Sequence, residues 1–75
     1  LFRSPAELHR ITLRKLALID YATQVNQLKI PPGNRLEKLR GDYIGFYSLR
    51  VNDQWRVIFK WSGENATDVS IIDYH

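Results

Sequence analysis

The sequence predicts one α+β domain, 1–75, in which helices come first and a small antiparallel β-sheet follows. Three observations lead to this prediction. Apolar residues recur at helical spacing in the first part of the chain, they alternate with polar residues in the second part, and the segments between the alternating stretches are short. A chain of 75 residues has room for a single hydrophobic core.

A first helix is predicted over Pro5–Asp20. Ser4 can cap it, Pro5 suits the first helical position, and Glu7 completes a capping box. Lys15 falls within the apolar stripe of this helix and is expected to extend its amine outward to solvent. The stripe consists of Leu8, Ile11, Leu16, Leu18 and Ile19.

One or two helical turns are predicted within Tyr21–Lys29, and the Pro31–Asn34 turn then stops the helical pattern. Aromatic and β-branched residues follow in alternating stretches that are typical of strands. Short turns at 41–42, 52–54 and 62–65 imply antiparallel neighbours. The predicted strands are Arg35–Leu39, Phe46–Val51, Trp55–Trp61 and Asp68–His75.

Alternation assigns the two faces of this sheet, because successive side chains of a strand point to opposite sides. The face that packs against the helices should hold Tyr47, Leu49, Val51, Trp55, Val57, Phe59 and Trp61. The opposite face should be a basic and partly aromatic surface that includes Arg50, Arg56, Ile58 and Lys60.

Composition narrows the functional classes. Eleven Lys and Arg against eight Asp and Glu give a net charge of +3 and a pI near 9.5, which mildly favours a polyanionic partner. The chain has no cysteine, so nothing indicates an oxidising compartment, and the predicted location is the cytoplasm. No apolar run approaches the length of a bilayer-spanning helix, so no membrane partner is predicted.

No metal or other cofactor is predicted. His9 and His75 lie far apart in the sequence, neither belongs to a metal-ligand motif, and there is no glycine-rich phosphate loop. Metal-free RNA cleavage needs only a proton acceptor, cations for the phosphate and an acid for the leaving oxygen. A histidine, whose ordinary pKa is about 6.5, can exchange that proton, and an arginine can hold a phosphate through two parallel bonds.

Each candidate also has an ordinary structural interpretation. A histidine at the end of a chain is usually solvated, an arginine on a strand usually faces water or forms an ion pair, and a tyrosine more often packs than stacks on RNA. His9 is expected to be a surface residue. Composition and spacing alone therefore indicate a small basic α+β domain with an electropositive sheet face.

Three separated motifs carry a more specific indication. They are Pro31–Asp42, Tyr47–Arg56 with its Asn52-Asp53-Gln54-Trp55-Arg56 segment, and Val69–His75 with its Asp73-Tyr74-His75 ending. In this order, and together with the leading helix, they resemble the HigB branch of the RelE-type ribonuclease toxins. The resemblance implies a RelE-like fold, with N-terminal helices packed on an antiparallel sheet. It also implies a toxin that cleaves mRNA in the ribosomal A site without a metal.

The same resemblance assigns candidate residues. The catalytic positions that it implies are Arg40, Arg56, Asp73, Tyr74 and His75. Other cations and amides near them, expected to contact RNA, are Lys38, Arg50, Gln54 and Lys60. Arg40 stands where many relatives have a lysine, so it is better suited to clamping phosphate than to exchanging a proton.

Two departures from the family pattern affect these expectations. Glu37 occupies a position where some relatives have a histidine, which leaves the general base open. Relatives also have a strand and a further helical segment before the first helix, and Leu1-Phe2-Arg3 is too short to supply them. Two interpretations follow: the given sequence is a fragment whose preceding residues supply these segments, or the domain is a truncated variant that lacks the N-terminal strand and has an open sheet edge.

The partners implied are mRNA on the ribosome and a cognate helix-turn-helix antitoxin of the HigA type, with operator DNA contacted only through that antitoxin. Two alternatives use the same fold without catalysis. One is a gyrase poison of the ParE kind, which the Asp73-Tyr74-His75 ending disfavours. The other is an inactive remnant that only binds its antitoxin.

Overall fold

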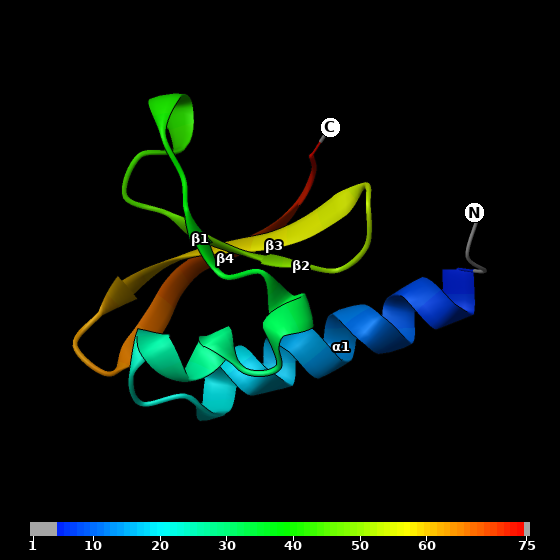
Figure 1. Cartoon of the computed structure of the whole chain (residues 1–75), viewed down its shortest axis with the longest axis horizontal. Coiled ribbons are helices and arrows are strands. Elements are labelled where there is room, and N and C mark those ends of the chain that lie inside the picture. The colour runs from blue at the N-terminus through cyan, green and yellow to red at the C-terminus, as the bar shows by residue number, and fades with distance from the viewer. Residues whose placement is uncertain (1–4, 75) are drawn as a thin grey trace.

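A computed structural model of the chain describes residues 5–74, with only the backbone of Pro5 included. The described part begins with one long helix, α1, Pro5–Tyr21, which two short 3-10 turns and then four strands follow, with a third 3-10 turn between the first two strands (Figure 1). Ser4, the predicted cap, and His75 lie outside the described residues. The 3-10 turns are η1 Val25–Lys29, η2 Pro32–Asn34 and η3 Gly41–Tyr43, and the strands are β1 Glu37–Lys38, β2 Tyr47–Arg50, β3 Trp55–Ser62 and β4 Asn65–Asp73.

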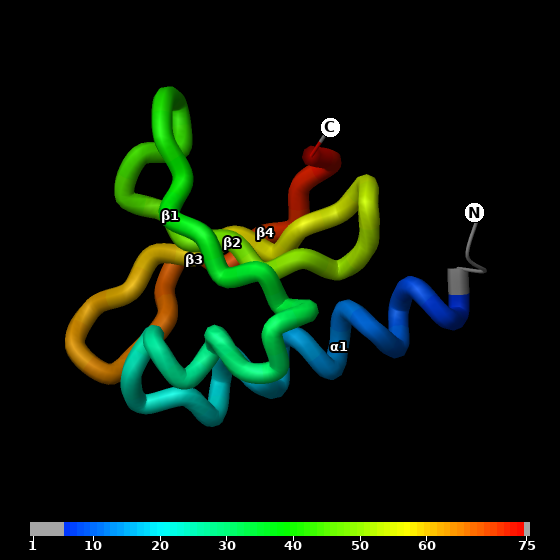
Figure 2. Tube along the Cα trace, viewed as in Figure 1, coloured from blue at the N-terminus to red at the C-terminus, as the bar shows by residue number. Residues whose placement is uncertain are grey.

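The strands form a four-stranded sheet in the order β1-β2-β3-β4, and every neighbouring pair is antiparallel. This meander confirms the predicted α+β class. Figures 1 and 2 show α1, η1 and η2 gathered on one side of the sheet, while the β1–β2 connection projects from the other side. The two faces of the sheet therefore have different environments.

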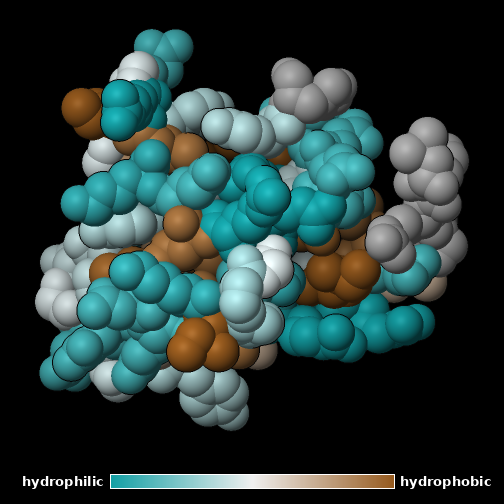
Figure 3. Space-filling model, viewed as in Figure 1, coloured by the Kyte–Doolittle hydropathy of each residue, from teal (hydrophilic) through white to brown (hydrophobic). Residues whose placement is uncertain are grey.

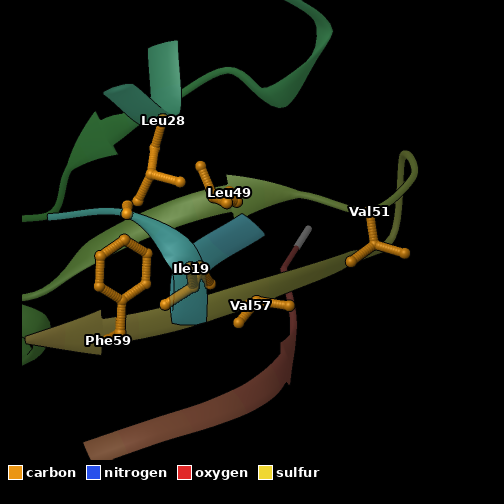
Figure 4. Packing of buried hydrophobic residues seen from close by; sticks show 7 residues of the cluster. Ile19, Leu28, Leu49, Val51, Val57 and Phe59 are labelled. Atoms are coloured by element: carbon orange, nitrogen blue, oxygen red, sulfur yellow. The ribbon is translucent and has the colours of Figure 1, made fainter. Parts of the chain in front are cut away.

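The hydrophobic core lies between the sheet and α1 (Figure 4). Leu49, Val57 and Phe59 have no exposed surface, and Ile19 and Leu28 close over them from the helical side. Leu49 pairs with Val57 and Tyr47 with Phe59, so the face assignment made by alternation is confirmed for these positions. Trp55 and Trp61 are half-buried at the edges of the same cluster.

Every strand differs from its predicted bounds by at least one residue, most of all the first and the last, and the last ends at Asp73. β4 begins at Asn65 rather than Asp68, because the turn shrinks to Gly63-Glu64 and Ala66 already pairs with Trp61. Asp68 has a φ of 52°, which would ordinarily end a strand. β4 continues through it because its pairing with β3 shifts register between Ile58 and Lys60, which leaves room for the extra residue. The first strand contracts to β1, after a left-handed residue at Arg35 (φ 48°).

The sheet face away from α1 is less open than predicted. Ile58 is 2% exposed and Arg56 is 9% exposed, and Leu39 is also buried. The backbone N–H of Leu39 donates to the carbonyl of Phe46, which folds the β1–β2 connection back on itself beside this face. The far face is therefore partly covered rather than a free basic surface. Throughout the described residues, no helix is long and apolar enough to span a membrane.

Candidate active site

Arg56 is the centre of the candidate site. Its Nη1 donates to the Oγ of Ser48 at 3.0 Å and lies 3.1 Å from Oε1 of Glu37. Strand register explains this meeting: Glu37 on β1 pairs with Ser48 on β2, and β3 brings Arg56 to the same face. A buried guanidinium needs such partners, since desolvation of an unpaired charge is costly.

Tyr74 covers the guanidinium from another direction. The Cζ atom of Arg56 lies 4.6 Å from the centre of the Tyr74 ring, within the range of a cation–π contact. The backbone N–H of Tyr74 donates to the carbonyl of Gln54 at 2.6 Å, which fixes the chain just after β4. The carboxylate of Glu37 and the aromatic ring of Tyr74 thus both contact Arg56.

The loop before Arg56 has a local reason for its sequence. The Oδ1 atom of Asn52 accepts from the backbone N–H groups of Gln54 (2.9 Å) and Trp55 (2.8 Å), which is how an asparagine side chain stabilises a tight turn. The Nε2 atom of Gln54 donates to Oδ2 of Asp73 at 3.1 Å. Two motifs that are far apart in the sequence are therefore joined at one place.

An open hollow of about 500 Å³ adjoins this cluster. Arg40 borders it and is exposed, and Tyr74 lies on its wall. Because Glu37 also lines the hollow, the partner of Arg56 is accessible to a bound molecule. The remaining lining residues are Lys38 and Leu39.

The predicted RNA-contacting residues fall in different places. Arg50 pairs with Arg56 across β2 and β3, and its Nη2 lies 2.5 Å from Oδ1 of Asp53. Lys60 is exposed, and its amine lies 5.1 Å from the centre of the Phe46 ring. Lys38 on β1 pairs with Tyr47 on β2, and the Lys38 amine lies 5.9 Å from the centre of the Tyr47 ring.

The structure thus brings Arg56, Tyr74, Asp73 and Gln54 together, with Arg40 across the hollow, and leaves the Lys38 amine beside Tyr47. His75 lies outside the described residues. Sequence reasoning did not identify Ser48, and it noted Glu37 only as a departure from the family pattern. A signal was present, because both are polar residues at alternating positions of the predicted strands, on the side opposite Leu49.

The lysine within the apolar stripe of α1 does not reach outward as predicted. The Nζ atom of Lys15 donates to Oδ1 of Asn34 at 2.5 Å, and Asn34 itself is fully buried. Burial, and then the nearby charges of Arg14 and Arg50, lower the pKa of Lys15 from its ordinary value of 10.5. This pair joins α1 to η2 and lies apart from the Arg56 cluster.

Metal ligands do not gather at the site or elsewhere in residues 5–74: no group of three or more His, Cys, Asp or Glu side chains there is arranged to hold an ion. His9 is exposed on α1, as expected, beside Thr12 and Trp55. The side chains that contact Arg56 are a carboxylate, a hydroxyl and an aromatic ring.

Two named relatives resemble much of this chain. Over 57 residues the chain is 46% identical to Toxin HigB-1 of Vibrio cholerae serotype O1, covering 76% of this chain and 60% of that protein. Over 61 residues it is 33% identical to the Endoribonuclease HigB of Proteus vulgaris, covering 81% and 65%. The chain thus spans about 60 to 65% of the length of these relatives.

A solved structure, the YoeB-YefM complex from Staphylococcus aureus, superposes with a TM-score of 0.67 at 21% identity. The match covers 96% of this chain and 76% of that one, and it shows a common RelE-like fold. The family model described as "RelE-like toxin of type II toxin-antitoxin system HigB" matches residues 3–75. Because that match takes in nearly the whole sequence, the chain belongs to the HigB-like family of RelE-like toxins.

Proposed function

We propose that this chain is a metal-independent endoribonuclease that cleaves mRNA in the ribosomal A site, in the cytoplasm, and so blocks translation. The observation that carries the proposal is the pairing of a buried Arg56 with Glu37 at the rim of a hollow that Arg40 also borders. Arg40 borders the hollow directly, and the buried Arg56 contacts two of its lining residues, Glu37 and Tyr74. Two guanidiniums so placed suit a phosphate group, because each presents several N–H donors in a fixed plane. A family relative is also named an endoribonuclease.

The reaction proposed is attack of a ribose 2′-oxygen on the adjacent phosphorus. The new P–O bond gives a cyclic phosphate, the bond to the 5′-oxygen breaks, and that oxygen leaves with a proton. Arg56 and Arg40 hold the negative charge that grows on the phosphate oxygens. His75 delivers the proton to the leaving oxygen, and Asp73 and Tyr74 position the end of the chain.

Glu37 is the proposed acceptor for the 2′-hydroxyl proton. Its side chain is 49% exposed and lines the hollow, so a ribose can approach the carboxylate. A phosphate that binds Arg56 competes with this ion pair, because both anions use the same guanidinium. Substrate binding would therefore release Glu37 from Arg56 when the base is needed.

The proposed partner that silences the toxin is a cognate helix-turn-helix antitoxin of the HigA type, through which alone the chain would contact operator DNA. Support comes from the family, which is a type II toxin-antitoxin family, and from the solved neighbour, which is a complex. No membrane takes part in this proposal. Lys38, Arg50, Gln54 and Lys60 remain the proposed contacts to RNA.

A ribosome-loaded cleavage assay tests the proposal. Ribosomes stalled on a defined message are incubated with the full chain in EDTA at a concentration that leaves ribosomes intact, and the message is mapped by primer extension. We expect cleavage by the natural sequence and a loss of at least about 100-fold in Arg56→Gln and His75→Ala. Lys29→Ala, a change of an exposed lysine on η1, is the matched control.

Circular dichroism of each variant separates lost chemistry from lost folding. An intact message with folded natural protein would contradict the proposal. If the same protein then inhibited gyrase, the ParE-like alternative would replace it, and if it only bound antitoxin, the chain would be a non-catalytic member of the family.

A further inference from the structure

The connection between β1 and β2, residues 39–46, projects beside the candidate active site (Figures 1 and 2). Its own backbone holds it: Tyr43 N–H donates to the Arg40 carbonyl at 3.2 Å, and Phe46 N–H donates to the Tyr43 carbonyl at 3.0 Å. Gly41 (φ 65°) and Gly45 (φ 93°) supply the two left-handed positions that the tight path requires. The projection therefore presents its side chains in a fixed way.

The side chains at its tip are not those of an ordinary solvated turn. Tyr43 is 40% exposed and Ile44 is 76% exposed, although a surface turn usually carries polar residues. The Tyr43 ring meets the Phe46 ring edge-on, with 6.0 Å between centroids. In the space-filling view, the corresponding lobe at the upper left carries apolar residues directly beside hydrophilic ones (Figure 3).

Two cationic side chains and the carboxylate of Asp42 lie close to these rings in the chain or in space. The amine of Lys60 lies over the Phe46 ring, and Arg40 begins the same 3-10 turn that ends at Tyr43. Arg40 also borders the hollow that contains Glu37 and Tyr74. A chain of aromatic and cationic groups therefore runs from the tip of the projection to the candidate catalytic cluster.

We propose that Tyr43, Phe46 and Lys60, here called the aromatic tip, bind a nucleotide of single-stranded RNA next to the scissile phosphate. Tyr43 stacks on its base, Phe46 supports the Tyr43 ring from its edge, and Lys60 holds a neighbouring phosphate. Single-stranded RNA is bound in this manner, by bases on aromatic faces and by cations along the backbone. The proposal rests on the proposed function, because it assigns the same RNA a second point of contact.

Direct binding to RNA tests it. The probe is a short fluorescein-labelled single-stranded RNA whose cleavage-site ribose is 2′-deoxy, so that it cannot be cut, and binding to the full chain is followed by anisotropy. We expect Tyr43→Ala to weaken binding about tenfold, the effect of losing one stacked base, and Tyr43→Phe to bind as the natural protein does. The matched control is Tyr21→Ala, because Tyr21 is 84% exposed at the far end of α1.

Three outcomes would overturn the proposal: no binding by the natural protein, unchanged binding by Tyr43→Ala, or equal losses in Tyr43→Ala and Tyr21→Ala. A Tyr43→Ala variant that binds RNA normally but loses affinity for the antitoxin would also overturn it, since the tip would then be a protein-docking surface. Failure of the proposed function would give a different result. The message on ribosomes would stay uncut, while the probe would still bind and Tyr43→Ala would still weaken that binding.

Discussion

The two faces of the sheet differ in what they bury: one buries apolar side chains and the other buries polar and charged ones. On the face toward α1, Leu49, Val57 and Phe59 are fully buried among other apolar side chains. On the opposite face, Arg56 and Ser48 are also buried, but they contact each other and an acidic residue that remains open to solvent. The first face contributes most of the folding energy, whereas the second face holds a charge at the edge of an accessible hollow.

The largest expected effect lies on the apolar face. Phe59→Ala removes a fully buried ring from the centre of the core and should lower the free energy of unfolding by about 3–5 kcal/mol, which approaches the total stability of a small domain. Urea denaturation followed by circular dichroism measures this change. If the free energies of unfolding of the variant and the natural protein differ by less than about 1 kcal/mol, the apolar face does not supply most of the stability.

An intermediate effect is expected on the polar face, and it should be chemical rather than structural. Glu37→Gln removes the proposed proton acceptor and should reduce the cleavage rate by about 100-fold or more. Affinity for the uncleavable RNA should hold or rise, because Arg56 no longer has a competing carboxylate. Single-turnover cleavage and anisotropy measure the two quantities separately, and a parallel loss of both would mean that Glu37 only supports the fold.

The smallest expected effect concerns the lysine that joins α1 to η2. The pKa of Lys15 is lowered in the folded protein, so the unfolded chain binds more protons between that pKa and 10.5. Stability should therefore rise with pH across this window, as the cost of burying the charge disappears. The test is the free energy of unfolding of the natural protein minus that of Lys15→Met, measured at pH 7 and at pH 10. This value should increase with pH, and a value that falls or stays constant contradicts the prediction.

Local patterns were sufficient for the apolar face. Alternation placed Val57 and Phe59 correctly because each residue's side of a strand depends only on its own position in the strand. Local patterns could not predict the partners of Arg56. Glu37 and Ser48 lie beside it only because three strands pair in one particular register. The Lys15–Asn34 bond, which spans 19 positions, was missed for the same reason.

Strand ends were also set by more than local preference. Asp68 is a turn former by sequence, yet β4 passes through it because a register shift takes up the irregular backbone. The family resemblance identified Arg56, Asp73 and Tyr74 as site residues, but the contacts among them became visible only in three dimensions. The roles given to these residues stay predictions until cleavage is measured.

The hydrogen bond from Tyr74 N–H to the Gln54 carbonyl has a practical consequence for experiments on this protein. It directs the chain, immediately before His75, alongside the guanidinium of Arg56. Because Tyr74 both lines the hollow and contacts Arg56, a label or tag placed close to it would disturb the candidate site. A label on this protein is better attached to an engineered cysteine at Thr23, an exposed position just after α1 and among the helical segments.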